Sequence, residues 1–258
     1  MSNPPLKITF LGTGTSTGVP MVACPCAVCA SADPKDKRLR SSILVQSATT
    51  TIVVDTTPDF RWQMLRAGVR RLNAVIFTHP HKDHLAGLDD VRAYNFFQHK
   101  AMDLYANEMT QESIVREFPY AFADVRYPGI PELRLNRIEK EPFTIGDITI
   151  VPIQVWHMKM PVLAFRFGDF TYITDANRID EAQREKIRGS EQIVLNALRH
   201  EKHLSHFSLA EAIEEVRLLG IPKAWFTHIS HQLGKHAEVN PALPRGMQLA
   251  YDGLTLET

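Results

Sequence analysis

The sequence has few cysteines, no net charge and no long apolar run. Its three cysteines all lie between positions 24 and 29, which is too few and too clustered for a disulfide framework. Basic and acidic residues number 29 each, so no overall field would attract nucleic acid or an anionic membrane. No apolar run approaches the ~18 residues of a membrane span. The first residues, MSNPPLKITFLG, lack the pattern of a secretory signal, so we expect a soluble cytoplasmic protein without a membrane partner.

The chain also lacks a low-complexity linker and a clean internal repeat. A length of 258 residues with 44% hydrophobic content suits one large domain, so we expect residues 1–258 to form a single unit. Apolar periodicity predicts strands at Leu6–Leu11, Ser42–Gln46, Thr51–Val54, Ala74–Phe77, Ile148–Val155, Leu163–Phe167, Thr171–Ile173, Gln192–Leu195 and Ala224–Thr227. It predicts helices at Asp59–Ala67, Leu88–Gln98, Ile179–Ile187 and Leu209–Leu219. Strands that alternate with helices in this way indicate an α/β fold.

Three further segments carry specific expectations. Residues Gln248–Leu256 resemble a closing hairpin around Asp252-Gly253. Pro119–Pro131 is the stretch with the least pattern and is expected to be a loop or cover. The endings IFTHPH at 76–81 and WFTHISH at 225–231 are alike, which hints at two pseudo-symmetric halves.

The segment FTHPHKDHLAG, residues 77–87, is the most informative in the chain. It follows a buried-strand pattern, and strand ends are where functional sites collect in layered α/β proteins. Residues two apart in an extended segment face the same side, so His79 and His81 can face one point. Asp83 and His84 begin the next helix and can face a neighbouring point. Imidazole and carboxylate are ligands for zinc, manganese or iron, so HxHxDH here predicts a metal site.

Four ligand-type residues from one loop cannot complete two coordination shells. Three more residues of the right type end strand-like runs elsewhere in the chain. His157 follows ITIVPIQVW, Asp175 follows FTYIT, and His228 follows KAWFT. Each alone has a structural explanation, but the shared position makes a joint metal site the better interpretation.

This set of residues resembles the metallo-β-lactamase fold over nearly the whole chain. The resemblance implies a four-layer αββα sandwich with two metals at one edge. It implies that one metal is held by His79, His81 and His157. It implies that the second is held by Asp83, His84 and His228, with Asp175 as the bridge. True β-lactamases commonly carry a cysteine where Asp175 stands, so the resemblance points to the dinuclear hydrolases.

Further residues resemble the PhnP-like cyclic phosphodiesterases, with the ribonuclease Z group as a nearby relative. They are the opening FLGTGTSTGVP, the cluster Cys24-Pro-Cys26-Ala-Val-Cys29, and His206-Phe-Ser before a predicted helix. The opening glycines do not match a dinucleotide fingerprint, since the third glycine comes one place late, and a tight turn near the active site is the better interpretation. No segment resembles the long arm that ribonuclease Z uses for transfer RNA, which disfavours a nuclease.

The cysteine cluster predicts a second kind of metal site. Three thiolates in a CxCxxC pattern need one further ligand to close a tetrahedral zinc site. The PhnP resemblance places that ligand at His231, and His236 is the alternative. A site with four protein ligands leaves no position for substrate, so this zinc would be structural, tying the cysteine loop to the His228 loop.

The expected chemistry is attack on phosphorus by a hydroxide shared between two divalent metals, zinc or manganese. Asp83 and Asp175 would act as metal-holding catalytic residues. His206, the extra histidine of the PhnP and ribonuclease Z groups, would protonate the leaving alkoxide. Asp55 ends the TIVVD strand and would either hold a ligand histidine in one tautomer or cap a helix. Whether Arg199, His200 or His203 contacts substrate is left open.

The function favoured by these residues is a metal-dependent phosphodiesterase acting on a small phosphodiester, a cyclic one included. The alternatives are a ribonuclease Z-like nuclease and a thioester or lactone hydrolase on the same metals. The expected cofactors are two catalytic divalent metals and one structural zinc. The expected partner is a small-molecule substrate, with nucleic acid not favoured and a homodimer left open.

Overall fold

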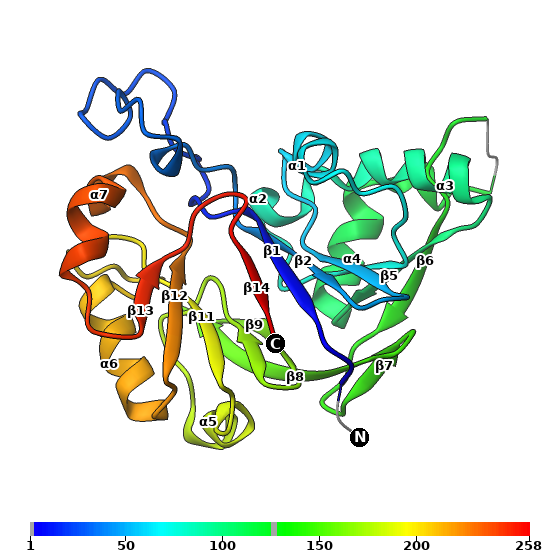
Figure 1. Ribbon diagram of the computed structural model, residues 1–258. Helices are drawn as coiled ribbons and strands as arrows, with labels where there is room; N and C mark the ends of the chain where they lie inside the picture. Colours follow the sequence, from blue (N-terminus) through cyan, green and yellow to red (C-terminus); the bar gives the residue numbers. More distant parts are fainter. Residues whose placement is uncertain (1–2, 125–127) are drawn as a thin grey trace.

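The computed structural model of the protein describes residues 3–124 and 128–258, and in these residues two β-sheets lie face to face (Figure 1). The first sheet has the strand order β14-β1-β2-β3-β4-β5-β6. Its strands are β1 (Lys7–Gly12), β2 (Ser42–Gln46), β3 (Thr51–Val54), β4 (Ala74–Ile76), β5 (Met102–Ala106), β6 (Leu133–Arg137) and β14 (Thr255–Glu257).

The second sheet has the strand order β13-β12-β11-β10-β9-β8-β7. Its strands are β7 (Phe143–Ile145), β8 (Ile148–His157), β9 (Met160–Phe167), β10 (Phe170–Tyr172), β11 (Gln192–Asn196), β12 (Lys223–Thr227) and β13 (Met247–Leu249). The helices are α1 (Phe60–Ala67), α2 (Lys82–Leu85), α3 (Arg92–Gln98), α4 (Glu108–Glu117), α5 (Glu181–Ile187), α6 (Leu209–Leu219) and α7 (His236–Val239). Short 3₁₀ turns are η1 (Pro34–Asp36), η2 (Leu88–Val91), η3 (Pro119–Ala121), η4 (His231–Leu233) and η5 (Asn240–Ala242).

Three apolar clusters define the layers. The inner cluster fills the space between the sheets with side chains such as Phe10 and Phe165. A second cluster packs α1, α3 and α4 on the outer face of the first sheet, and a third packs α5 and α6 on the outer face of the second. The arrangement is the expected αββα sandwich, because each sheet must bury both faces and each helix one stripe.

The two sheets repeat one pairing pattern. From β14 to β3 the neighbours are antiparallel, and from β3 to β6 they are parallel. From β7 to β10 the neighbours are antiparallel, and from β10 to β13 they are parallel. Strands β3 and β10 therefore occupy equivalent places, where the direction of pairing switches.

The pseudo-symmetry differs from the one hinted at by the repeated FTH endings. IFTHPH follows β4 and WFTHISH follows β12. In the repeated strand order β4 corresponds to β11, whereas β12 corresponds to β5. The like endings are therefore not at equivalent places, although both reach the same edge of the sandwich.

Most predicted elements are present within a few residues of their expected bounds, with the 88–98 helix divided into η2 and α3. The predicted closing hairpin was wrong. Its first half, β13, pairs with β12 in one sheet, and its second half, β14, pairs with β1 in the other. The turn at Asp252-Gly253 thus carries the chain from one sheet to the other. Which sheet each strand joins depends on long-range pairing, which a local sequence pattern does not reveal. Within the predicted loop Pro119–Pro131, residues 119–121 form η3, and residues 125–127 lie outside the described residues.

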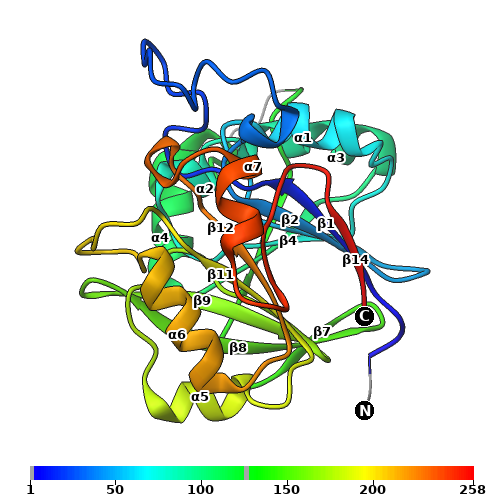
Figure 2. The same ribbon diagram turned by 60° about the vertical axis from the view of Figure 1, so that its left-hand side comes forward.

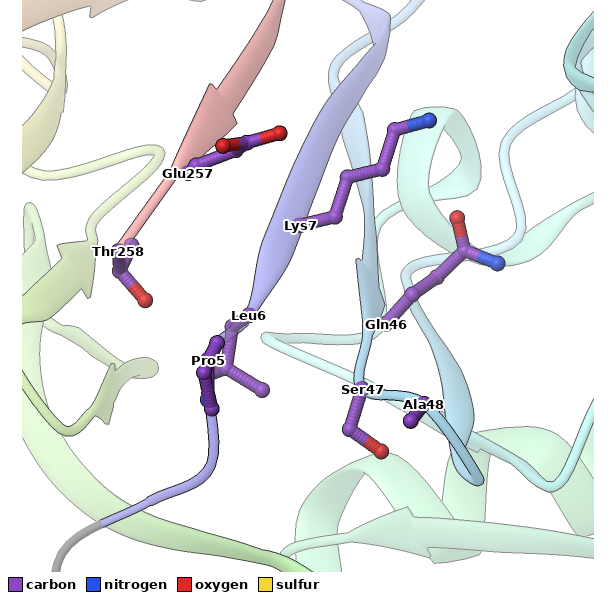
Figure 3. A pocket seen from close by; sticks show the side chains of 8 residues that line it. All are labelled: Pro5, Leu6, Lys7, Gln46, Ser47, Ala48, Glu257 and Thr258. Atoms are coloured by element: carbon purple, nitrogen blue, oxygen red, sulfur yellow. The ribbon is translucent and has the colours of Figure 1, made fainter.

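The chain ends and the cysteine loop lie at opposite ends of the molecule (Figures 1 and 2). Leu6 N–H donates to Thr258 O, and β14 pairs with the first half of β1. A groove at this end is lined by Lys7, Gln46 and Glu257, whose side chains project from neighbouring strands (Figure 3). It lies at the start of β1, whereas the predicted metal ligands lie near the other end of that strand. Within the described residues, no helix is long and apolar enough to cross a membrane.

Candidate metal centre

The predicted ligand residues all converge at the carboxyl-end edge of the sandwich. His79 and His84 follow β4, and His157 is the last residue of β8. Asp175 follows β10, and His228 directly follows β12. The strands come from both sheets, so the two halves of the chain meet at this site.

Three residues at this edge have an unusual backbone. Asp55, Asp175 and His228 are non-glycine residues in the left-handed region, with φ of 66°, 55° and 55°. Such conformations cost free energy and persist when neighbours hold them. The neighbours are found here: Asp55 N–H donates to Ile76 O, and the peptide after His228 donates to Thr13 O. The bend turns each side chain out of its strand toward the site.

The carboxylate of Asp175 is the centre of the arrangement. Its Oδ1 lies 3.0 Å from His228 Nδ1 and 3.3 Å from His84 Nε2. Its Oδ2 lies 3.7 Å from His79 Nε2. The group is buried, so its charge requires positive or hydrogen-bonding partners within this small space.

Three overlapping sets of side chains could each hold a metal ion, and Asp175 belongs to all of them. In each set the ligand atoms lie within 4.8 Å of one another. The sets are Asp83, His84, Asp175 and His228; His79, His81 and Asp175; and His157, Asp175 and His206. The ring centres of His81 and His157 are 5.1 Å apart, so His157 approaches the predicted first-metal residues. The geometry thus brings all seven predicted ligands together, and their assignment to particular metals stays a prediction.

The donor atoms fit a metal on chemical grounds. His79 Nε2, His84 Nε2 and His228 Nδ1 are buried and have no hydrogen-bond partner within the described part of the chain. Burial lowers the pKa of His79 well below its usual value. Burial also acts to lower the pKa of His84, but the carboxylates of Asp175, Asp83 and Asp55 outweigh it and raise that pKa. Inward-facing nitrogens beside excess negative charge are what a divalent cation requires.

Hydrogen bonds on the outer side leave the inner nitrogens of two histidines free. Asp55 Oδ1 accepts from Thr78 N–H at 2.8 Å and Oδ2 accepts from the Thr78 hydroxyl at 2.8 Å. Asp55 Oδ2 also lies 2.7 Å from His84 Nδ1. Because its proton is given to Asp55, the Thr78 hydroxyl accepts from His79 Nδ1 at 2.9 Å. Both rings therefore present Nε2 to the site.

His157 and His228 are oriented by groups that the sequence analysis missed. His157 Nδ1 donates to Ser205 O at 2.8 Å, so its Nε2 is available to the site. His228 presents Nδ1 to Asp175, while its Nε2 lies 3.2 Å from the Thr15 hydroxyl. Thr15 belongs to the glycine-rich opening, whose expected place near the site is confirmed. Ser205 acts through a backbone carbonyl, which no side-chain pattern could indicate.

Asp55 contacts a candidate ligand histidine and does not cap a helix. The N-cap position of α1 is Asp59, four residues later, so the helix-cap alternative was wrong. Burial raises the pKa of Asp55, which opposes its ionisation, while His84 and Thr78 favour the carboxylate. A buried carboxylate with these partners is the usual support for a metal-binding histidine.

His206 lies between two of the predicted ligand histidines and is buried. Its ring centre is 4.6 Å from that of His157 and 4.8 Å from that of His228. Burial lowers the pKa of His206 to about 3, with a further lowering from His228. The imidazole is therefore neutral at pH 7 in this structure and carries a single N–H donor.

The other polar residues of the His206 loop lie further out. The Arg199 guanidinium donates to Gln232 Oε1 at 2.9 Å and to carbonyls of its own loop, which occupies its donors in holding the loop. His200 is exposed. His203 is also exposed, although its ring stacks on His206 with centres 5.3 Å apart. Of these three residues, His203 is the best placed to reach a bound molecule.

The predicted zinc ligands form a separate cluster. Cys24, Cys26, Cys29 and His231 offer ligand atoms within 4.8 Å of one another. His231 Nδ1 lies 3.4 Å from Cys24 Sγ and 3.3 Å from Cys26 Sγ. The backbone N–H of Cys29, together with His231, lowers the pKa of Cys26 to about 6, which favours the thiolate that zinc binds. Three thiolates and one imidazole fit a closed tetrahedral zinc site.

The alternative fourth ligand, His236, has a different place. Its Nδ1 lies 3.4 Å from Arg38 Nη2, and its backbone N–H donates to Asp36 at 2.7 Å. Arg38 also donates to the Thr13 hydroxyl at 2.8 Å and to Ala250 O at 2.6 Å. This buried network anchors the cysteine loop to the segments beside the metal centre.

Comparison with known proteins identifies the family. The family described as beta-lactamase superfamily domain matches residues 50–229, more than half of the chain. The chain belongs to the beta-lactamase superfamily. The matched residues include all seven predicted ligands of the metal centre, from His79 to His228. The predicted metallo-β-lactamase fold is thereby confirmed.

Two solved structures are similar to this chain. A crystal structure of a diphosphatase from the PhnP family is 40% identical, with a TM-score of 0.93, over 98% of this chain and 97% of that one. The short form of human tRNase Z has a TM-score of 0.69 over 97% of this superfamily member and 98% of the human chain. Its identity is 15%, so it supports the fold alone.

Two sequence relatives carry other names. An octanoyltransferase of Porphyromonas gingivalis is 37% identical over 252 residues, covering 96% of this chain and 51% of that protein. A coenzyme PQQ synthesis protein B of Methylobacterium nodulans is 31% identical over 164 residues, covering 57% of this chain and 52% of the relative. The chain thus spans about half the length of each of these relatives.

The cysteine cluster gives the first prediction. Replacement Cys26→Ser should lower the melting temperature and reduce zinc content by about one ion per chain, because zinc affinity in such a site contributes directly to folding stability. Thermal unfolding and elemental analysis measure the two effects. Val22→Ser, an exposed change in the same loop, is the matched control and should alter neither. Unchanged stability and zinc content in Cys26→Ser would show that the cysteines are ordinary loop residues.

The second prediction concerns Asp55. Replacement Asp55→Asn leaves one acceptor oxygen where the carboxylate uses two, for Thr78 and His84 Nδ1, and should weaken metal binding by about 10–100-fold, the usual effect of losing such a partner. Competitive titration with a chelating indicator measures the affinity. Asp169→Asn is a control at an exposed carboxylate. Wild-type affinity in a folded Asp55→Asn protein would contradict a positioning role.

Proposed function

We propose that residues 1–258 act as one metal-dependent phosphodiesterase domain that hydrolyses a small phosphodiester, a cyclic one included. The observation that carries this proposal is the buried Asp175 carboxylate shared by three sets of ligand side chains, with His206 beside it. The similarity to a PhnP-family diphosphatase supports hydrolysis at phosphorus.

The proposed roles are those that the family resemblance implies, and the convergence of the side chains at one edge supports them. The first metal would be held by His79, His81 and His157. The second would be held by Asp83, His84 and His228, with Asp175 between the two. Divalent metals bound here, zinc or manganese, would supply an activated water and positive charge beside the phosphoryl oxygens. Asp55, Thr78, Thr15 and Ser205 keep the histidines in the tautomers described above, so that little reorganisation is needed on binding.

His206 would serve the leaving group. Its neutral imidazole can donate one N–H hydrogen bond to the departing oxygen. An anionic phosphoryl group placed beside it would favour the protonated form, which opposes the effect of burial. In either protonation state the residue would donate a hydrogen bond to the developing alkoxide. It would thereby stabilise the leaving group better than water does.

The named relatives support two neighbouring activities as alternatives. A diphosphatase cleaves a bond between two phosphates, and the same ligand set would serve that bond. The octanoyltransferase relative favours an acyl substrate, so hydrolysis of an octanoyl thioester is the candidate outside phosphorus chemistry. A ribonuclease Z-like activity has weaker support, because the chain carries no net charge to attract a polyanion.

A substrate panel tests the proposal. Protein reconstituted with zinc or with manganese is assayed on bis-p-nitrophenyl phosphate, a 2′,3′-cyclic nucleotide, a dinucleoside diphosphate, precursor transfer RNA and an octanoyl thioester. We expect the phosphodiesters to be cleaved fastest, and cleavage to cease on chelation. Preference for the diphosphate, the thioester or the RNA would replace the proposal with the corresponding alternative.

His206 generates a sharper prediction. His206→Ala should retain its metals and lose about 10²–10⁴-fold in turnover of alkyl phosphodiesters, the usual size of a proton-transfer contribution. The loss should shrink for p-nitrophenyl esters, whose leaving group needs little protonation. Paired rates on both substrate types, with metal content measured in parallel, provide the test.

The control for this prediction is His200→Ala in the same loop, whose exposed ring is expected to leave both rates unchanged. Equal losses on the two substrate types in His206→Ala would exclude the leaving-group role. Loss of metal in that variant would instead make His206 a ligand, an arrangement that its distances to His157 and Asp175 permit.

A further inference from the structure

Four histidine rings form a stack that runs from the metal centre to the surface. The rings of His84 and His228 are stacked with centres 5.8 Å apart and an angle of 12° between their planes. His228 and His206 follow at 4.8 Å and 25°, and His206 and His203 follow at 5.3 Å and 27°. The first three residues are buried, whereas His203 is exposed. Because one face of the His203 ring lies against His206, the opposite face is the one open to a ligand.

The His203 ring is held in this orientation by its own loop. The backbone N–H of Ser205 donates to His203 Nδ1 at 3.3 Å, and the Ser205 hydroxyl lies 3.1 Å from the same atom. A backbone N–H can only donate, so Nδ1 is the acceptor and the neutral ring carries its proton on Nε2. Ser205 O in turn accepts from His157 Nδ1. The exposed ring is thus fixed before a ligand arrives, and binding against it costs little side-chain entropy.

Two exposed apolar residues lie in the same region. Leu204, next to His203, is 80% exposed, and Met158, directly after the predicted ligand His157, is 54% exposed. The side chain of Asn177 joins their backbones, because its Nδ2 donates to Leu204 O at 2.9 Å and its Oδ1 accepts from Met158 N–H at 2.9 Å. We call His203, Leu204 and Met158 the outer rim. It combines a flat aromatic face with apolar side chains beside the metal centre.

We propose that the open face of His203 stacks against a heteroaromatic ring of the substrate, which is a nucleotide ester with its nucleoside on the leaving-group side. This inference rests on the proposed phosphodiesterase function and names its substrate class. Nucleobases stack on histidine and on other aromatic side chains. His206, the proposed partner of the leaving oxygen, lies between His203 and the predicted ligand His228. A base joined to that oxygen through a sugar would therefore come next in line, at His203.

The reaction that this placement implies is hydrolysis of the bond between phosphorus and the nucleoside oxygen. The oxygen of water is transferred to phosphorus, and a proton is transferred to the departing oxygen, so that the nucleoside leaves as a neutral alcohol. No oxidant or second substrate is needed.

An alkyl chain is the other group that the outer rim would accept. It would gain from contact with Leu204 and Met158, because burial of apolar surface is non-directional. It would gain nothing specific from a flat imidazole face, whereas planar rings gain from parallel, offset alignment. The continuous stack that ends at His203 therefore favours a planar ring over an alkyl chain.

Binding of paired ligands tests the stack without any turnover. Metal-loaded protein is titrated calorimetrically with adenosine 5′-monophosphate and with ribose 5-phosphate, which lacks the base. Wild type should bind the nucleotide about 5–150-fold more tightly, the range for stacking one base on an aromatic side chain. His203→Ala should bring this ratio close to 1, whereas His203→Phe, which keeps a flat ring, should retain most of it. His200→Ala, an exposed change in the same loop, is the matched control and should keep the wild-type ratio.

Rates on paired diesters separate this inference from the proposed function. The substrates are the methyl esters of adenosine 5′-monophosphate and of ribose 5-phosphate, and methyl octyl phosphate. The adenosine ester should have the highest kcat/KM and release adenosine and methyl phosphate, and its advantage should fall in His203→Ala but not in His203→Phe. If no diester is cleaved while the binding ratio holds, the proposed function fails and the stacking site stands.

Four outcomes overturn the inference. They are equal affinities of the wild type for the nucleotide and the ribose phosphate, a binding ratio that His203→Ala leaves intact, equal losses of that ratio in His203→Ala and His203→Phe, and fastest cleavage of the octyl ester. The third would assign the effect to a hydrogen bond from Nε2, and the fourth would assign the outer rim to an alkyl chain. Melting temperature and metal content, measured in both variants, show whether they are folded and loaded.

Discussion

The structure depends on placing one carboxylate, Asp175, among histidines where water is excluded. A buried anion is stable only if positive charge or hydrogen-bond donors surround it. Here those partners come from the loops after β4 and β12 and from the last residue of β8, so strand ends from both sheets meet around one charged group at a single edge. The two sheets provide rigid strands. The loops at the ends of these strands meet because the buried Asp175 carboxylate needs partners from both sheets.

The repeated strand order places two aspartates of this site at equivalent positions in the two sheets. Strands β3 and β10 occupy equivalent switch positions, and each is followed by an aspartate with a left-handed backbone, Asp55 and Asp175. The two aspartates make different contacts. Asp175 faces the histidines directly, whereas Asp55 lies one layer behind and orients His84 and Thr78. The same backbone conformation thus places a candidate metal ligand in one half of the chain and, in the other half, a carboxylate that holds a candidate ligand histidine.

Much of this could be predicted from the sequence, because strands such as Ser42–Gln46 and helices such as Leu209–Leu219 have strong apolar periodicity. The capping box at Ser208 and Glu211 sharpens the start of α6 in the same local way. The candidate ligands could be listed because their chemistry is rare at strand ends. The path of residues 247–257 could not, because its two strands join different sheets through long-range pairing. Nor could the role of Ser205, which acts through its backbone carbonyl.

The bond from His157 to Ser205 O has a consequence for the loop that carries His206. Such a loop would ordinarily be regarded as a lid, free to open while the centre beneath stays assembled. Here its backbone fixes the tautomer of a histidine on the opposite hairpin, so the loop cannot lift without releasing that ring. Opening of this loop and the orientation of His157 are thus coupled, because the segment that carries His206 also holds that ring in place.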